Sequence, residues 1–111
     1  MKTTVDWLRF RTLSNPFETL EAIRPAFGSV AHLVQFGDHQ KGKDGWQSRR
    51  EIVLAGDVTL GEVDYGGESQ RGWLRWNMPG AGCEFVEDWA VVARLVTVLN
   101  SPQLRRVDLA L

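Results

Sequence analysis

The stretch from Gly61 to Cys83 constrains the fold most, because it places six of the chain's eleven glycines around two strand-like runs. The runs are GEVDY (61–65) and RGWLRWNM (71–78), and the five residues GGESQ connect them. A connection of this length that contains Gly is typical of a β-hairpin with a longer loop. We therefore predict a hairpin here, with Gly66 and Gly67 adopting positive φ angles in the loop.

The second run of this hairpin separates into two different faces. Successive side chains of a strand point to opposite sides of a sheet. The apolar side chains that should face a core are Leu74, Trp76 and Met78. The side chains on the other face are Trp73, Arg75 and Asn77. An indole, a guanidinium and an amide are unusual for a surface that contacts only water.

Other predicted strands repeat this pattern. In TTVDWLRFRT (3–12), the alternation places Leu8 and Phe10 inward, and the outward residues are Trp7, Arg9 and Arg11. In the strand predicted for 46–55, Arg49 faces outward, whereas Ile52 and Leu54 face inward. In the last strand, 103–111, the inward residues are Val107, Leu109 and Leu111, and the outward residues are Leu104, Arg106, Asp108 and Ala110.

Two helices complete the prediction. Asn15 is a suitable N-cap, Pro16 suits the first helical position, and an apolar stripe starts at Phe17 and continues through Leu20. Apolar residues at helical spacing predict a second helix within 84–99, with Glu84, Glu87 and Asp88 in its first turn. A short strand is expected at 30–36, followed by a polar turn at 39–45.

The predicted element order is β-α-β-β-β-β-α-β within one domain of 111 residues. This order indicates an α+β fold, an antiparallel sheet with both helices on one face and the other face open. The residues that the register gathers on the open face are Trp7, Arg9, Arg11, Arg49, Trp73, Arg75, Asn77 and Arg106.

Three explanations fit an open face of this composition. Ten of the thirteen basic residues are arginine, the side chain suited to planar stacking and bidentate contacts. The Trp and Arg side chains could pack on one another across strands, stack and neutralise single-stranded nucleic acid, or anchor a partner protein. The net charge of −1 excludes attraction to nucleic acid by overall charge alone.

Candidates for catalysis or metal binding are fewer. The acidic residues that could supply oxygen ligands to Mg²⁺ or Mn²⁺ are Asp6, Glu62, Asp64 and Asp108. Asp108 is the best of them because it lies mid-strand on the open face. An ion pair with a neighbouring Arg would also account for an aspartate at this position. A single cysteine, Cys83, makes a zinc site or a disulfide improbable, and we expect it to be structural. We expect Tyr65, beside the glycine turn, to pack rather than to act as a nucleophile.

Three segments carry a resemblance to a known family. The segments are VDWLRFRT (5–12), VDYGGESQRGWLRWNMPGAGCEFVEDW (63–89) and LRRVDLAL (104–111). In the same order, they resemble the N-terminal part of the replication initiation factors of filamentous phages and related plasmids. These are rolling-circle initiators related to the trans-acting plasmid Rep proteins. The middle segment is long and specific, whereas the end segments alone would be weak.

The resemblance implies a phage origin, a Rep-like sheet domain and DNA as a partner, single-stranded or as an origin hairpin. The family nicks DNA with a tyrosine and a divalent metal held by acidic side chains, and only Asp108 matches a metal-ligand position. Members continue beyond LRRVDLAL and their nucleophilic tyrosine is expected there, so we expect this chain alone to lack strand-transfer activity and to need no cofactor.

Two origins are compatible with this resemblance. The chain could be a domain of a longer initiator, or a stand-alone phage protein that inhibits a host nucleoprotein effector, as anti-CRISPR proteins do. With no signal peptide and no long apolar run, the sequence predicts a soluble protein in the cytoplasm of a bacterial host, away from membranes.

Overall fold

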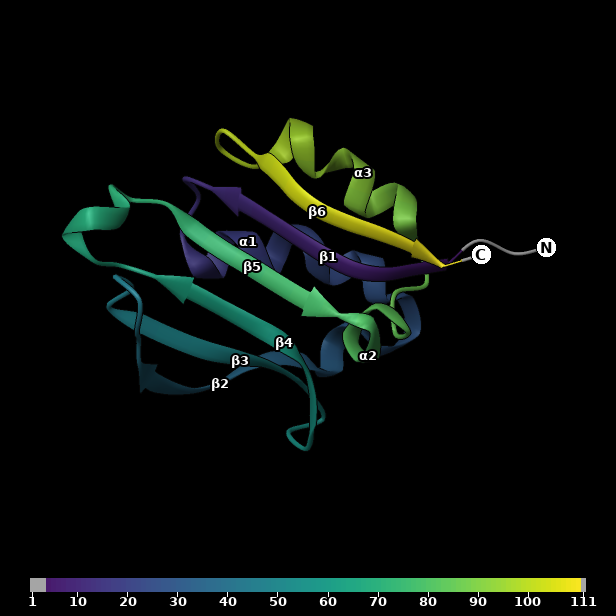
Figure 1. Cartoon of the computed structure of the whole chain (residues 1–111). Coiled ribbons are helices and arrows are strands. Elements are labelled where there is room, and N and C mark those ends of the chain that lie inside the picture. The colour runs from purple at the N-terminus through teal and green to yellow at the C-terminus, as the bar shows by residue number, and fades with distance from the viewer. Residues whose placement is uncertain (1–3, 111) are drawn as a thin grey trace.

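The computed structural model describes the backbone of residues 4–110 and the side chains of residues 5–107. It is an α+β fold in which six antiparallel strands form one sheet in the order β2-β3-β4-β5-β1-β6 (Figure 1). The elements are β1 (Thr4–Thr12), α1 (Pro16–Ile23), the 3-10 helix η1 (Arg24–Leu33), β2 (Val34–Lys41), β3 (Ser48–Leu54), β4 (Val58–Tyr65), the 3-10 turn η2 (Glu68–Gln70), β5 (Leu74–Pro79), α2 (Gly80–Cys83), α3 (Trp89–Val98) and β6 (Gln103–Ala110). The predicted fold class and the order of strands and main helices are confirmed.

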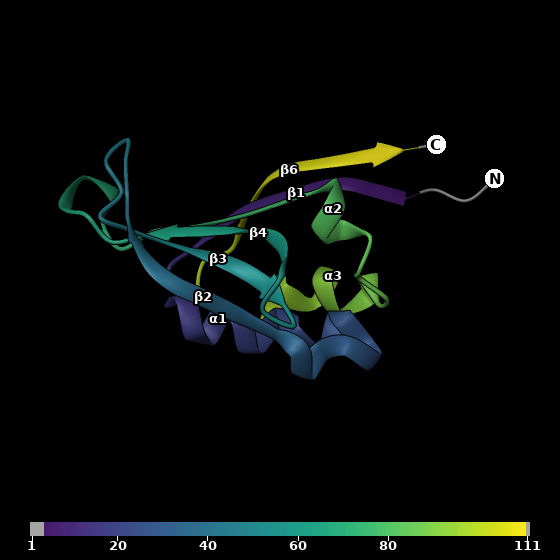
Figure 2. The ribbon, with the colours of Figure 1, turned by 90° about the horizontal axis from the view of Figure 1, so that it is seen from below.

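The helices α1, η1 and α3 lie on one side of the sheet, which leaves the other side open (Figure 2). The core fills the space between the sheet and these helices. On the central strands β1 and β5, alternate apolar residues face it, and Phe10 stacks on Trp76 with ring centroids 5.9 Å apart. Leu8, Trp76 and Met78 are almost completely buried, as the alternation predicted.

Helix α1 begins where the sequence predicted. The side-chain oxygen of Asn15 accepts a hydrogen bond from the backbone N–H of Glu18 at 2.8 Å, and the amide of Asn15 donates to the carboxylate of Glu18 at 2.7 Å. This reciprocal pair satisfies groups that a helix start would otherwise leave unpaired. The apolar stripe is only partly as predicted, because Leu20 is buried whereas Phe17 is mostly exposed.

The second predicted helix begins later than expected. Gly80–Cys83 forms the short helix α2, and α3 starts at Trp89 with Asp88 as its N-cap. Glu84 and Glu87 therefore do not lie in the first turn of a long helix. Instead, the carboxylate of Glu87 accepts hydrogen bonds from the backbone N–H and the hydroxyl of Ser29, which ties the segment between α2 and α3 to η1.

Strand and loop boundaries also differ from the prediction. The predicted strand 30–36 is replaced by the end of η1 and by β2, which runs from Val34 to Lys41 and includes part of the predicted polar turn. The hairpin loop between β4 and β5 extends to Trp73 rather than ending at Gln70. Gly66 and Gly67 have φ angles of 74° and 102°, so the predicted positive φ angles are confirmed.

Strand β6 contains an irregularity that the sequence did not reveal. Arg9 pairs with Arg106, but the next residue, Phe10, pairs with Leu104, so Arg105 is an extra residue in the ladder. Because of this extra residue, the side chains of β6 before the bulge point to the opposite face from the one that strict alternation predicts. The prediction that Leu104 faces the open side is therefore wrong: it lies beside Val107 on the helix side of the sheet. Leu109, Leu111, Asp108 and Ala110 have side chains outside the described residues.

None of the helices in the described part of the chain has the length and apolar character needed to cross a membrane.

Candidate nucleic-acid interface on the open sheet face

The open face gathers the predicted residues on neighbouring strands. Strand β1 lies between β5 and β6, and its register places Arg9 opposite both Asn77 and Arg106. Arg49 on β3 is joined to this group through β4, because it pairs with Asp64, which in turn pairs with Arg75. The face is thus a continuous polar surface across β3, β4, β5, β1 and β6.

A buried carboxylate organises one half of this face. Asp64 is only 1% exposed and lies between two guanidinium groups. Arg49 Nε donates to Asp64 Oδ1 at 2.7 Å, and Arg75 Nη2 donates to Asp64 Oδ2 at 2.8 Å. The hydrogen bond that Arg49 donates to Asp64 raises the pKa of Arg49, because it stabilises the charged guanidinium. These contacts join three strands, so Arg49 and Arg75 are held in place by the fold itself.

The amide of Asn77 organises the other half. Its Oδ1 accepts hydrogen bonds from Trp7 Nε1 at 2.8 Å and from Arg9 Nε at 3.0 Å. Its Nδ2 donates to Glu62 Oε1 at 3.0 Å. Asn77 is buried, and it connects β1, β4 and β5 through one side chain. Its predicted place on the open face is correct, but its groups are already used inside the protein.

A guanidinium lies over each of three tryptophan rings. The distances from the guanidinium carbon to the ring centroid are 4.5 Å for Arg11 and Trp73, 4.1 Å for Arg106 and Trp7, and 5.3 Å for Arg75 and Trp46. Such cation–π contacts hold both partners at a defined position. The Trp–Arg packing that the sequence left open therefore occurs in three places on this face.

Trp46 was missed as a member of this face. As the first residue of the predicted strand 46–55, Trp46 would point to the side of the sheet opposite to Arg49. Instead it lies in the connection between β2 and β3, where Trp46 N donates to Lys43 O, and this connection is tied to the β4–β5 loop by a hydrogen bond from Gln47 N to Gly66 O. This connection and the β4–β5 loop both rise on the side away from the helices (Figure 2). Loop closure brings Trp46 to Arg75, and no periodicity in the sequence signals it.

The described residues do not gather the predicted metal ligands. Both oxygens of Asp64 accept from arginines, and Glu62 accepts from Asn77. Within the described residues there is no group of three or more His, Cys, Asp or Glu side chains that could hold a metal ion. The side chain of Asp108 lies outside the described residues, so its predicted role as a metal ligand remains a prediction.

Tyr65 makes a structural contact. Its hydroxyl accepts a hydrogen bond from Arg50 Nε at 3.1 Å, and its ring packs against the hydrophobic core. Arg50 also donates to the carbonyl of Gly37 on β2. Tyr65 thus helps to join strands β2, β3 and β4, which agrees with the packing role expected from the sequence.

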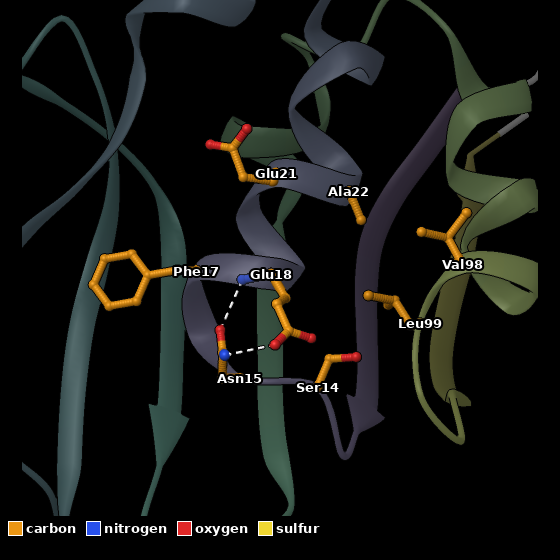
Figure 3. A pocket seen from close by; sticks show the side chains of 8 residues that line it. All are labelled: Ser14, Asn15, Phe17, Glu18, Glu21, Ala22, Val98 and Leu99. Carbon is orange, nitrogen blue, oxygen red and sulfur yellow. Dashed lines mark hydrogen bonds between the residues drawn. The ribbon is translucent and has the colours of Figure 1, made fainter.

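A hollow of about 590 Å³ lies elsewhere, between the start of α1 and the end of α3 (Figure 3). Its polar side chains already have partners: Asn15 and Glu18 bond each other at the start of α1, Glu21 pairs with Arg24 of η1, and Ser14 Oγ accepts from Asn100 N. The carboxylates that border it therefore stabilise the helix, and none of the predicted binding residues lines it.

No family model matches the chain, and neither do the curated proteins or the solved structures with which it was compared. The resemblance to replication initiation factors thus remains a prediction.

Proposed function

We propose that the chain binds single-stranded DNA, or a hairpin with unpaired bases, through the β1 side of the open face. The observation that supports this most directly is the difference between its arginines. Arg49 and Arg75 are neutralised by Asp64, whereas Arg9 and Arg11 take part in no ion pair among the described residues. The described carboxylates of the face, Glu51, Glu62 and Asp64, lie on β3 and β4.

Positive charge on the face is therefore concentrated along β1, beside the Trp–Arg pairs. Phosphate groups are attracted to such unneutralised guanidiniums, and bases stack on aromatic rings and on guanidinium planes. The pair of Arg11 and Trp73 offers both kinds of contact at one point. Because the surrounding network holds these side chains, little conformational entropy remains to be lost on binding.

The binding test uses fluorescence anisotropy with a labelled single strand of about 20 nucleotides, a hairpin with an unpaired loop and a blunt duplex. We expect the single strand and the hairpin to bind more tightly than the duplex. The logarithm of affinity should fall with the logarithm of salt concentration, with a slope of about −0.7 for each phosphate neutralised. No salt-dependent binding at low salt, or tighter binding of the duplex, would contradict the proposal.

A pair of variants locates the surface. Arg11→Gln should weaken single-strand binding and reduce the salt slope by about 0.7, because one phosphate contact is lost. Arg94→Gln removes the same charge from an exposed position on α3, on the other side of the sheet, and should leave binding unchanged. Equal losses in both variants would show that overall charge, and not the open face, attracts the DNA.

Binding without cleavage is the second part of the proposal. The family's nicking activity, with Mg²⁺ or Mn²⁺, is not expected of this chain, because Tyr65 is engaged with Arg50 and packed against the core. We expect no relaxation of supercoiled DNA in Mn²⁺ and no effect of EDTA on anisotropy. A Mn²⁺-dependent nick that disappears in Tyr65→Phe would overturn this part. DNA binding of this kind would place the protein in the cytoplasm of its bacterial host.

A stand-alone phage inhibitor of a host defence complex, comparable to an anti-CRISPR protein, is the second candidate. Exposed apolar side chains beside β6, among them Val96 and Leu104, favour a protein partner. The test measures target cleavage by purified guide-RNA effectors of the bacterial host at equimolar amounts of this protein. Cleavage that stays at its full rate with every effector would count against this candidate.

A further inference from the structure

Strand β6 forms an edge of the sheet. It is paired with β1, and within the described residues no other strand lies on its outer side. Figure 1 shows it along the rim of the molecule, next to α3. An edge strand presents backbone N–H and C=O groups that can pair with another extended chain.

The opposite edge of the sheet, β2, is protected. Its ladder with β3 is irregular between Phe36 and His39. Two of its carbonyls accept hydrogen bonds from arginine side chains, Val34 from Arg24 and Gly37 from Arg50. Irregular pairing and occupied carbonyls discourage the addition of a strand. Of the two edges, β6 is therefore the better acceptor.

An apolar groove follows β6 on the helix side of the sheet. It has a volume of about 360 Å³ between β6 and α3, and every residue that lines it is apolar. Val96 is 66% exposed and Leu104 is 64% exposed, although both border this groove. The bulge at Arg105 creates the arrangement, because it places Leu104 and Val107 on the same side.

The other features of β6 are basic. Arg106 lies over Trp7 on the open face and Arg105 is exposed, so β6 carries two arginines against one aspartate, Asp108, whose side chain lies outside the described residues. A chain added along β6 would direct alternate side chains to the two faces of the sheet. Those on the helix side would meet the groove, and those on the open side would meet Arg106.

We propose that β6 pairs with an extended segment of a partner protein in which apolar and acidic residues alternate. Backbone pairing supplies part of the affinity, and the groove and the arginines select the side chains. The net positive charge of the edge favours this occupant over a second copy of the chain, whose own β6 would bring two further arginines and only one aspartate alongside these. Like charges on neighbouring strands destabilise the pairing.

The first experiment selects binders from a display library of random peptides of about ten residues, a length that covers a strand of ordinary size. The enriched peptides should alternate acidic and apolar residues, and replacing their acidic residues by Lys should abolish binding. Enrichment without this alternation, or no enrichment over the blank support, would overturn the proposal.

Two substitutions on the same helix locate the binding of a selected, labelled peptide. Val96→Asp places a charge in the groove and should weaken binding by about ten-fold or more, which corresponds to ~1.4 kcal/mol. Val98→Asp is the matched control, because Val98 is equally exposed, at 65%, but does not line the groove. Similar losses in both variants would remove the groove from the proposal.

Hydrogen exchange separates strand pairing from docking in the groove alone. With the peptide bound, amides of β6 should exchange more slowly, while those of β2 should be unchanged. Protection of α3 without β6 would show that the peptide does not form a strand. Sedimentation of the chain alone should show a monomer, and a concentration-dependent dimer that Val96→Asp dissociates would assign the edge to a second copy and overturn the proposal.

Discussion

The two faces of the sheet are stabilised by different interactions between the same strands. On the helix side, Phe10 and Trp76 connect β1 to β5 by apolar stacking in a core without charges between them. On the open side, the neighbouring residue of each strand, Arg9 on β1 and Asn77 on β5, connects the strands by a hydrogen bond. The comparison shows that the open face has two kinds of arginine: Arg49 and Arg75 are neutralised by Asp64, whereas Arg9 and Arg11 take part in no ion pair among the described residues. Substitutions in the two groups should have separable effects.

The largest effect should come from the helix side. Trp76 is completely buried, and Trp76→Ala should reduce the free energy of unfolding by ~3–5 kcal/mol, because it leaves a cavity beside Phe10 and Phe36. Urea unfolding monitored by circular dichroism measures this. The indole Nε1 is buried without a hydrogen-bond partner in the described residues. Trp76→Phe removes that unsatisfied donor and should therefore cost only ~1 kcal/mol, and an equal loss in both variants would contradict this account.

A smaller effect is expected from the buried carboxylate of the open side. Asp64→Ala leaves the guanidiniums of Arg49 and Arg75 without their common partner, and since both are partly exposed to water the cost should be ~2–3 kcal/mol. Asp57→Ala, in an exposed turn, is the matched control and should change stability by less than ~0.5 kcal/mol. The same Asp64 variant should bind single-stranded DNA at least as tightly as the wild type at low salt, because a negative charge has been removed from the face.

The amide of Asn77 should contribute less than Asp64. Asn77→Ala removes one acceptor and one donor and leaves Trp7 Nε1 and Glu62 without this partner. The expected loss is ~1–2 kcal/mol in urea unfolding, because these hydrogen bonds are only partly buried and water can reach their charged partners in the variant. Asn100→Ala, at an exposed position, is the control. If both variants are equally stable, the amide is not a structural part of the open face.

Alternation of apolar and polar residues predicted strands β1, β3 and β5 and the buried set that includes Leu8, Phe10 and Trp76, because burial of one sheet face imposes a period of two. The same alternation placed Trp7, Arg9 and Arg11 together on the open face. These predictions depend only on local geometry, which the sequence determines directly.

The errors arose where the chain departs from regular geometry. Leu104 changes face because one extra residue enters the ladder at Arg105, and Trp46 joins the open face because a loop closes over Arg75. Neither the bulge nor the loop closure leaves a periodic pattern in the sequence. The sharing of Asp64 between two arginines could not be predicted either, because it depends on which strands become neighbours, and alternation specifies a face but not a partner.

The last effect in this comparison concerns pH. Burial raises the pKa of the Cys83 thiol to about 11, and Asp6 adds to the increase. Because the folded pKa lies above the value of about 8.5 for an unfolded cysteine, this thiol contributes stability fully below pH ~8.5 and loses the contribution as the pH rises toward 11. The difference in unfolding free energy between the wild type and Cys83→Ala should thus decrease over this range, whereas other titrating groups affect both proteins equally. A difference that stays constant from pH 8 to pH 11 would show that Cys83 is not held in an environment that excludes charge. The helix side would favour the neutral form of a titrating group, while the open side favours the charged form, as the raised pKa of Arg49 beside Asp64 indicates.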